Sequence, residues 1–386
     1  MKVQQIVSSA VLATGAMAAR PWLNEADTGI ELVLGDLPVG ELPDLEQMVG
    51  LPDYEWAARN YMSDQNYTYY RNGAGGEWSY RNNMEIFQQF RFRPRAMVDV
   101  SKIEDSLPTT ILGHNFSAPF YISSCARAGL AHEGGEVNLV KAAAGGDVLY
   151  FPALYSSKTF DEIHDAKAEG QVVFQQLYIN EQNDTETQEL LDQSKAAGAN
   201  AIVFTIDSPA DGNRHRAVRF GVGSTDPSFN AYSWDFYHKL TNMTDLPIVL
   251  KGVGSVETAK QAVENGVEAI VLSNHGGRQV DGSQSALETA LEIHRDAPEI
   301  FEQLEVYADG GVRYGSDVIK LLSLGVRAVG LGRTFMYANV FGQEGVEKAI
   351  EQLKYEIAID AANIGIADLK KIDPSYVNWN SFPGLG

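Results

Sequence analysis

Two side chains that could together remove a hydrogen from a carboxylate-bearing molecule lie three positions apart, at His275 and Arg278. They belong to the segment 273–279, which directly follows the apolar run 268–272. An imidazole can accept a proton near neutral pH. A guanidinium can bind a carboxylate through two parallel hydrogen bonds and keep its charge. Two glycines between them let the backbone turn sharply beside a ligand. The segment therefore predicts a site for proton or hydride removal at the end of a buried strand.

Two glycine-rich loops further along the chain predict an anion site. The first spans 309–317 and opens a helical pattern, and the second spans 330–334. Glycines in such loops expose backbone N–H groups near a helix N-terminus, where an anion binds favourably. Each loop also contains an arginine, Arg313 or Arg333. A glycine-rich loop is more often simply a turn, but two of them with an arginine each indicate a phosphate site.

The elements that would position these residues alternate between strand-like and helix-like patterns. Eight short strand-like runs recur at 119–123, 148–152, 172–177, 201–206, 247–251, 269–273, 305–308 and 328–331. Helical patterns occur between them at 133–144, 186–197, 256–265 and 315–324. Alternation of this kind predicts a parallel sheet with crossover helices, and eight units predict a closed (β/α)8 TIM barrel. An open doubly wound sheet is the alternative, but no glycine-rich dinucleotide fingerprint follows the first run.

Residues suited to ligand contact follow seven of these runs, where the active sites of such barrels lie. They are Ser124 and Cys125, Gln176 and Tyr178, Thr205 and Asp207, Lys251, Asn274 and His275, Asp309, Gly310 and Gly311, and Gly332 and Arg333. The donors on the third to fifth strand ends suit a flat heterocycle with several acceptors. Lys251 could stabilise negative charge on a reduced flavin. It could instead form a Schiff base, or be a buried lysine paired with a carboxylate such as Asp207.

The chain divides into a leader, a lead-in and one large domain. Residues 1–18 combine a positive start, a mildly apolar stretch and a small-x-small cleavage pattern, which predicts a secretory signal peptide. A helical N-terminus is the alternative. Residues 19–52 are rich in proline, glycine and acidic residues and predict an extended lead-in. We expect helices over 53–90, the barrel over about 100–345 and an amphipathic tail helix over 344–362.

Composition limits the partners. Of 386 residues, 30 are Lys or Arg and 51 are Asp or Glu, a net charge of −21. Nucleic acids and anionic membranes both require a basic face, so we expect neither as a partner. The single cysteine excludes an internal disulfide and a cysteine-rich metal site, and we assign no metal ligands. The last residues form no peroxisomal signal. Sequons that agree with secretion and glycosylation occur at Asn66, Asn115, Asn183 and Asn242.

Segments 271–279 and 309–313 resemble the FMN-dependent 2-hydroxy acid oxidases and dehydrogenases, the family of glycolate oxidase, lactate oxidase and mandelate dehydrogenase. Further matching segments are Tyr69-Tyr70, 92–95, 176–178, 205–207 and 251–253. One of these motifs alone would say little, but together they are highly specific. The resemblance implies a TIM barrel with an N-terminal helical extension, a single FMN-dependent hydroxy acid dehydrogenase domain over 53–380.

The resemblance also implies roles for individual residues. His275 would be the base that takes the substrate proton as a hydride leaves for flavin N5, and Asp207 would stabilise the imidazolium. Tyr178 would bind the substrate hydroxyl. The substrate carboxylate would be bound by Arg278, Arg214 and Tyr69. The cofactor would be contacted by Ser124, Cys125, Ala126, Gln176, Thr205, Lys251, Ser273, Asp309, Gly310, Gly311, Arg313, Gly332 and Arg333.

Some segments depart from the family pattern. Ser124-Cys125-Ala126 replaces the usual Pro-Thr-Ala, which would put Cys125 unusually close to the cofactor. Leu154 stands where glycolate oxidase has a tryptophan, which predicts a wider substrate pocket. The short loop 221–232 favours an oxidase over a monooxygenase.

The leading hypothesis is an FMN-dependent oxidation of an (S)-2-hydroxy acid to the 2-keto acid. Dioxygen would reoxidise the flavin and yield hydrogen peroxide, with a soluble electron acceptor as the alternative. The resemblance also implies a homo-oligomer, a tetramer. Two other hypotheses stay open at this point: a barrel lyase or isomerase that uses Lys251 on a phosphorylated substrate, and a flavin-binding protein without catalysis.

Overall fold

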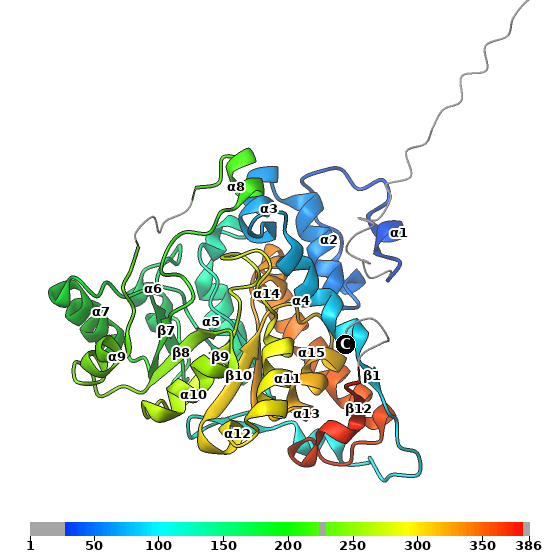
Figure 1. Ribbon diagram of the computed structural model, residues 1–386. Helices are drawn as coiled ribbons and strands as arrows, with labels where there is room; N and C mark the ends of the chain where they lie inside the picture. The colour runs from blue at the N-terminus through cyan, green and yellow to red at the C-terminus, as the bar shows by residue number, and fades with distance from the viewer. Residues whose placement is uncertain (1–27, 224–228, 381–386) are drawn as a thin grey trace, which may run out of the picture.

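The computed structural model describes residues 28–223 and 229–380. The predicted signal peptide, residues 1–18, lies outside the described residues, as does part of the predicted loop 221–232. Figure 1 shows one body in which helices surround a central barrel. Within the described ranges, no helix has both the length and the apolar character needed to cross a membrane.

Eight parallel strands form the barrel, as the alternating pattern predicted. They pair in the order β5-β4-β11-β10-β9-β8-β7-β6, and a parallel bridge between Tyr150 and Val173 joins the two ends of this order. Their bounds are β4 Phe120–Ile122, β5 Leu149–Tyr150, β6 Phe174–Leu177, β7 Ala201–Thr205, β8 Ile248–Val253, β9 Ala269–Leu272, β10 Glu305–Asp309 and β11 Ala328–Leu331. All eight predicted strands are therefore present: five are one to three residues shorter than expected, one has the expected length, and two are one residue longer.

Helices follow the strands, and most of them cover the outside of the barrel, whereas the short helix 215–219 lies at the top in Figure 1. They are α5 Glu136–Gly145, α6 Phe160–Asp165, α7 Asp184–Ala196, α8 His215–Arg219, α9 Trp234–Thr241, α10 Val256–Glu264, α11 Ala286–Asp296, α12 Ile300–Gln303, α13 Gly315–Ser323, α14 Arg333–Ala338 and α15 Gly342–Ile364. Helix α11 shows how local sequence sets such an element: Ser285 and Glu288 form a capping box at its start. Ala286, Ala290 and Ile293 recur at helical spacing and are buried.

An N-terminal extension packs against α11 and α14, and its residues Tyr69 and Tyr70 reach the carboxyl-end rim of the barrel. It contains α1 Ile30–Leu34, α2 Leu51–Tyr61, α3 Asp64–Arg71 and α4 Trp78–Gln89. The lead-in is thus not wholly extended, because α1 and a 3-10 turn at Leu45–Gln47 interrupt it. Strand β1 Arg91–Phe92 pairs antiparallel with β12 Val377–Asn378, which joins the extension to the end of the domain.

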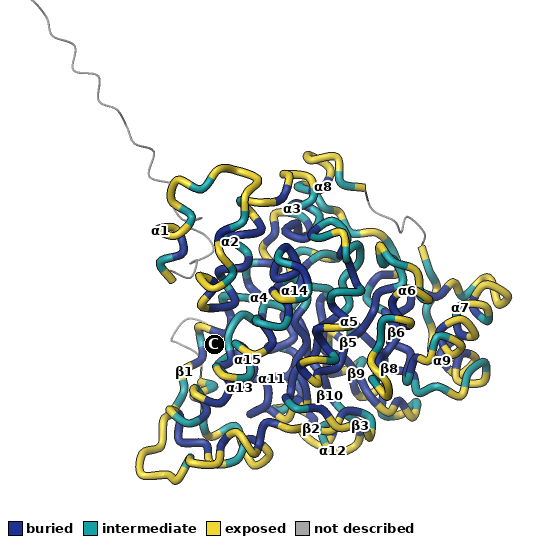
Figure 2. The backbone as a smooth tube through the Cα atoms, turned by 180° about the vertical axis from the view of Figure 1, so that it is seen from behind, coloured by how far each residue is buried: buried dark blue, intermediate teal, exposed yellow. Residues whose placement is uncertain are grey.

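Large aromatic side chains fill the barrel interior. Tyr121 stacks on Phe151 with ring centroids 4.4 Å apart, and Phe151 stacks on Phe174 at 5.6 Å. The hairpin β2 Thr109–Ile111 and β3 His114–Phe116 adds Ile111 and Phe116 to this cluster. Figure 2 shows the strands as a continuous buried centre beneath exposed outer loops. Because the interior is packed solid, any ligand must bind at an end of the barrel rather than inside it.

One tight contact joins the extension to the barrel at Gly311, which has φ +82°. A Cβ there would lie 1.9 Å from the carbonyl oxygen of Asn83 in α4. We expect Gly311→Ala to lower the free energy of unfolding by more than about 2 kcal/mol, because it adds a backbone clash to the strain of a left-handed conformation. Urea unfolding followed by tryptophan fluorescence measures this change.

Gly113 provides the matched control, because it has φ +77° but no heavy atom within 4 Å of the position that a Cβ would take. Gly113→Ala should cost only about 1–2 kcal/mol, the strain of the left-handed backbone alone. Equal losses for the two variants would show that α4 does not press on Gly311.

Candidate active site

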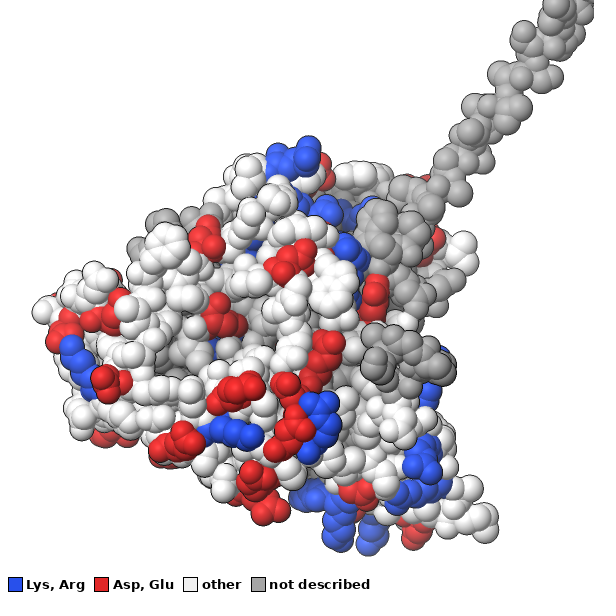
Figure 3. All heavy atoms as spheres, in the orientation of Figure 1, with Lys and Arg blue, Asp and Glu red and all other residues white. Residues whose placement is uncertain are grey.

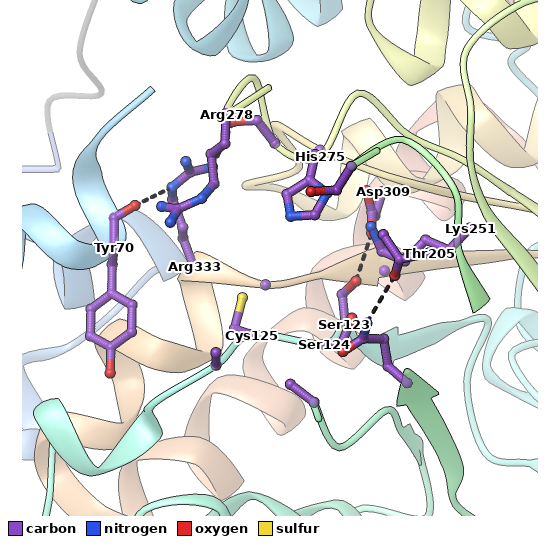
Figure 4. Close-up of a pocket in the computed structure, with 18 of the residues that line it drawn as sticks. Tyr70, Ser123, Ser124, Cys125, Thr205, Lys251, His275, Arg278, Asp309 and Arg333 are labelled. Carbon is purple, nitrogen blue, oxygen red and sulfur yellow. Dashed lines mark hydrogen bonds and ion pairs between the residues drawn. The ribbon is translucent and has the colours of Figure 1, made fainter. Parts of the chain in front are cut away.

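A pocket opens at the carboxyl ends of the barrel strands (Figure 4). Its volume is about 1160 Å³, including the solvent at its mouth. The walls come from the loops after β4, β5, β6, β7, β9, β10 and β11, and from Tyr69 and Tyr70 of α3. Each of these seven loops follows a parallel strand at the same rim of the barrel. Residues that are far apart in sequence therefore meet here.

A histidine–carboxylate pair lies on one side of this pocket. His275 Nδ1 is 2.7 Å from Asp207 Oδ1, and its Nε2 is 3.3 Å from the hydroxyl of Tyr178. Just past β9 the chain turns so that His275 adopts φ +58°, a left-handed conformation that is strained for a residue with a side chain. The Ser273 hydroxyl accepts a hydrogen bond from the His275 N–H at 3.0 Å and stabilises this turn. In this conformation Nε2 faces the pocket, and Nδ1 remains hydrogen-bonded to the carboxylate of Asp207.

The electrostatics of this pair favour a neutral imidazole beside a carboxylate. Burial lowers the pKa of His275 below its ordinary value, and the opposing attraction of Asp207 does not restore it. Burial alone would raise the pKa of Asp207, but its interaction with His275, which includes a hydrogen bond, holds it below its ordinary value. With Nδ1–H donating to Asp207, the free Nε2 is left as a proton acceptor.

This state predicts the pH dependence of the site. A base acts only when unprotonated, so its rate falls as the pH drops through its pKa. Because the pKa of His275 lies below the ordinary value of 6.5, we expect the rate of cofactor reduction by substrate to fall to half its maximum at a pH below 6.5. Stopped-flow measurements from pH 4.5 to 8 will locate the acid limb. A limb centred above 6.5 would contradict a neutral resting His275.

Two arginines line the pocket beside the turn that contains the histidine. Arg278 Nη1 donates to the carbonyl oxygen of Tyr69 at 2.9 Å, and Arg214 Nε donates to the carbonyl oxygen of Arg278 at 2.9 Å. Burial and then the neighbouring Arg214 lower the pKa of Arg278 to about 10. Two buried cations this close destabilise each other, and the Asp211 carboxylate, 3.9 Å from Arg214 Nη1, offsets this only in part. The pair is therefore suited to binding a carboxylate.

Basic side chains are unevenly placed over the surface. On the face shown in Figure 3, acidic side chains are spread over the helices around the barrel, while basic ones gather over α8 and along the lower edge. Arg214 directly precedes α8, and Arg216 in that helix forms a bidentate pair with Glu77 at 2.8 and 3.1 Å. The protein is strongly acidic overall, but an anion that approaches the pocket meets the basic side chains at and just before α8.

A buried polar network occupies the floor of the pocket. Asp309 accepts hydrogen bonds from the hydroxyls of Ser123 at 2.7 Å and Ser273 at 2.6 Å, and its carboxylate is 3.3 Å from Lys251 Nζ. The carboxylate paired with Lys251 is thus Asp309, not Asp207. Burial alone would lower the pKa of Lys251, but Asp309 and then Asp207 raise it above its ordinary value. A lysine held charged in this way is a poor Schiff-base nucleophile.

Most of the predicted site residues line the pocket. Those that do are Tyr69, Ser124, Cys125, Ala126, Gln176, Tyr178, Thr205, Arg214, Lys251, His275, Arg278, Asp309, Gly310, Gly311, Arg313, Gly332 and Arg333. Asp207 and Ser273 lie behind this wall and act through His275, Lys251 and Asp309. Arg333 lines the pocket while donating from Nε, Nη1 and Nη2 to the carbonyl oxygens of Tyr70, Gly276 and Asn72, so it also fastens α3 to the barrel.

Sequence reasoning also missed pocket residues. Leu154, expected to widen the pocket, does not line it, whereas its neighbours Ala153 and Tyr155 do. Ser208 and Asp211 line the pocket too. Their position in the sequence, between Asp207 and Arg214, could have identified them as candidate pocket residues.

The comparisons with known proteins agree with this geometry. The family model described as FMN-dependent dehydrogenase matches residues 58–228 and 223–379. The chain belongs to the FMN-dependent dehydrogenase family. It is 34% identical over 363 residues to the L-lactate dehydrogenase (cytochrome) of Wickerhamomyces anomalus, covering 88% of this chain but 63% of that protein. It is 35% identical over 360 residues to a peroxisomal (S)-2-hydroxyacid oxidase of Arabidopsis thaliana, covering 86% of this chain and 97% of that protein.

Solved structures of the family share the fold. The flavin-binding domain of baker's yeast flavocytochrome b2 matches with a TM-score of 0.83 at 33% identity, covering 88% of each chain. A mandelate oxidase matches with a TM-score of 0.78 at 31% identity, covering 86% of this chain and 98% of the other. At these identities the likeness extends beyond fold to the family's cofactor.

The pocket fits FMN, the cofactor of this family. Gln176 Nε2 donates to Thr205 Oγ1 at 2.9 Å, and with Lys251 these groups form a row across three neighbouring strand ends, which matches the polar edge of a flavin ring. The glycine-rich loops after β10 and β11 would hold the phosphate end through backbone N–H groups and Arg313. Cys125 Sγ would lie 2.8 Å from a Cβ at position 332, so glycine keeps this passage open. Figure 4 shows the Cys125 sulfur directed into the same space.

Proposed function

We propose that this protein oxidises an (S)-2-hydroxy acid to the corresponding 2-keto acid. The observation that supports this most strongly is that His275, with Asp207 and Tyr178, shares one pocket that fits FMN with Arg278 and Arg214. A carboxylate on the arginines would place the adjacent carbinol carbon between the histidine and the cofactor. Curated relatives named for lactate and for (S)-2-hydroxyacids agree with this substrate class.

The residues divide the chemistry as follows. Arg278, with Arg214 beside it, binds the substrate carboxylate, and Tyr69 adds a hydrogen bond to it. The Tyr178 hydroxyl, 3.3 Å from His275 Nε2, marks where the substrate hydroxyl lies. His275 Nε2 takes the hydroxyl proton, and the charge that forms is stabilised by Asp207 at 2.7 Å.

Bound FMN supplies the two-electron acceptor for the hydrogen that leaves the carbinol carbon. Lys251 and the donors beside it stabilise the negative charge that the reduced ring gains. The charged state of Lys251 serves this role and disfavours the lyase alternative, which requires a neutral amine.

Dioxygen is the proposed final acceptor, with hydrogen peroxide as the product. The relatives that the chain matches over 97% or 98% of their length are named as oxidases, among them the L-lactate oxidase of a Nostoc strain. Secretion, glycosylation and a homotetramer stay as predictions from the sequence. The sequons Asn115, Asn183 and Asn242 are exposed in the structure.

The test is the visible spectrum of the anaerobic protein before and after addition of a panel of 2-hydroxy acids. We expect flavin absorption that bleaches with at least one acid, and recovery on admission of air with formation of peroxide. A yellow protein that no acid bleaches would refute the reaction but not the cofactor. Bleaching that air fails to reverse, but a dye acceptor does, would refute dioxygen as acceptor.

A further inference from the structure

Asp211 places a carboxylate in the wall of the substrate pocket. It belongs to the loop between β7 and α8, lines the pocket, and has Oδ1 3.9 Å from Nη1 of Arg214. Among the acidic residues of the described pocket wall, Asp309 is committed to the Lys251 network on the floor. Asp211 pairs with Arg214 and lies at the level of the arginines, where substrate rather than cofactor is expected.

The position of Asp211 is held by its neighbours. Gln279 Nε2 donates to Ser208 Oγ at 2.6 Å and to the carbonyl oxygen of Ala210 at 3.0 Å. The other end of that amide, Oε1, accepts from Arg214 Nη2. The loop is therefore fastened on both sides of Asp211 to the turn that contains His275 and Arg278.

A close backbone contact keeps the same loop against the arginine turn. A Cβ on Gly212 would lie 2.1 Å from the carbonyl oxygen of Arg278. Only glycine fits there, and its neighbour Asp211 is thereby brought beside the proposed carboxylate-binding arginine. The Asp211 side chain is about one-third exposed, at 33%, so its charge is partly shielded but present at the pocket surface.

The opposite part of this wall is also ordered. Tyr155 stacks on Tyr178 with ring centroids 5.4 Å apart and an interplanar angle of 18°. Tyr178 in turn contacts His275. A substrate anchored by its carboxylate and hydroxyl would thus extend its side chain into a space bounded by Tyr155, Ser208 and Asp211.

The charge of Asp211 would discriminate among substrates by the side chain that each 2-hydroxy acid carries. A second carboxylate on the substrate would be repelled, because like charges at this distance raise the free energy of the complex. An apolar side chain would strip water from the carboxylate without replacing its hydrogen bonds. A hydroxyl or ammonium group would donate a hydrogen bond to it and be favoured.

We propose, as an extension of the function proposed above, that Asp211 makes this site select 2-hydroxy acids whose side chain bears a hydrogen-bond donor. Dicarboxylic hydroxy acids are rejected, and small apolar ones are poorer substrates.

The test uses the FMN-loaded protein and substrates that differ only at the side chain. The series is lactate, glycerate, 3-amino-2-hydroxypropanoate and malate, of matched configuration at the carbinol carbon, together with homologues one methylene longer. For the native protein we expect the hydroxyl and ammonium compounds to exceed lactate in kcat/KM by roughly 10-fold to 100-fold, the effect of one hydrogen bond to a charged group. Malate should be the poorest.

Two variants separate charge from shape. In Asp211→Asn the preference for the ammonium compound over lactate should fall by at least about 10-fold. In Asp211→Leu the order of lactate and glycerate should reverse. The control is Asp245→Asn, because Asp245 pairs with Lys195 on the surface away from the pocket and is 70% exposed. That control should keep the native order.

Binding provides a second readout. The affinities of pyruvate and hydroxypyruvate for the oxidised protein, measured from their perturbation of the flavin spectrum, should change in the same ratio as the kinetic preference. Native preference for lactate, or the same side-chain order in Asp211→Leu as in the native protein, would overturn the inference while leaving the reaction intact. Failure of every acid to bleach the flavin would instead overturn the proposed function.

Discussion

Replacement of His275 by alanine will slow the reduction of bound flavin by substrate by about 10²-fold to 10⁴-fold, the usual contribution of a positioned general base. The reason is geometric: Nε2 is the unprotonated nitrogen that faces Tyr178, and Asp207 holds it there through Nδ1. Rapid-mixing measurements without oxygen isolate this step from reoxidation. Flavin content and the unfolding transition should stay near those of the native protein.

The control for this substitution is His238→Ala. His238 lies on α9 and contacts Asn265 at 2.9 Å, away from the pocket. It should leave the reduction rate unchanged. A normal reduction rate in His275→Ala with full flavin content would show that another group removes the proton, and the catalytic assignment would have to be abandoned.

Replacement of Arg278 by methionine will weaken substrate binding by about 10²-fold to 10³-fold, because it removes a buried charged partner of the substrate carboxylate. The proximity of Arg214 will not compensate, since its Nε is committed to the carbonyl oxygen of residue 278. The concentration dependence of flavin reduction gives the apparent dissociation constant. The loss should be present for the acid and nearly absent for its uncharged methyl ester.

A purely structural role of Arg278 predicts a different result for this variant from a role in substrate binding. General damage to the pocket would weaken acid and ester equally, and that result would remove Arg278 from the substrate site. Arg295→Met is the matched control, because Arg295 pairs with Asp296 on the surface. It should alter neither constant.

Local sequence patterns were sufficient for the architecture. The eight apolar runs predicted the eight strands because buried parallel strands need short apolar β-forming segments regardless of their neighbours. The glycine-rich loops with arginines predict a phosphate site, because backbone N–H exposure is a local property, and both loops line the pocket. The lead-in was predicted less well: α1 is short and lacks a side-chain cap, so its helix signal was weak.

The parts of the site that depend on contact between two loops could not be predicted from the sequence. The sequence by itself determined the barrel, the family and the residue types at the strand ends, because those depend on short segments. Only the folded chain decided that Lys251 pairs with Asp309, that Ala153 and Tyr155 replace Leu154 in the wall, and that Asp211 lies beside the arginines. The physical reason is that each pairing depends on strand register and on close backbone contacts such as Gly212 against Arg278, which join segments more than 60 positions apart.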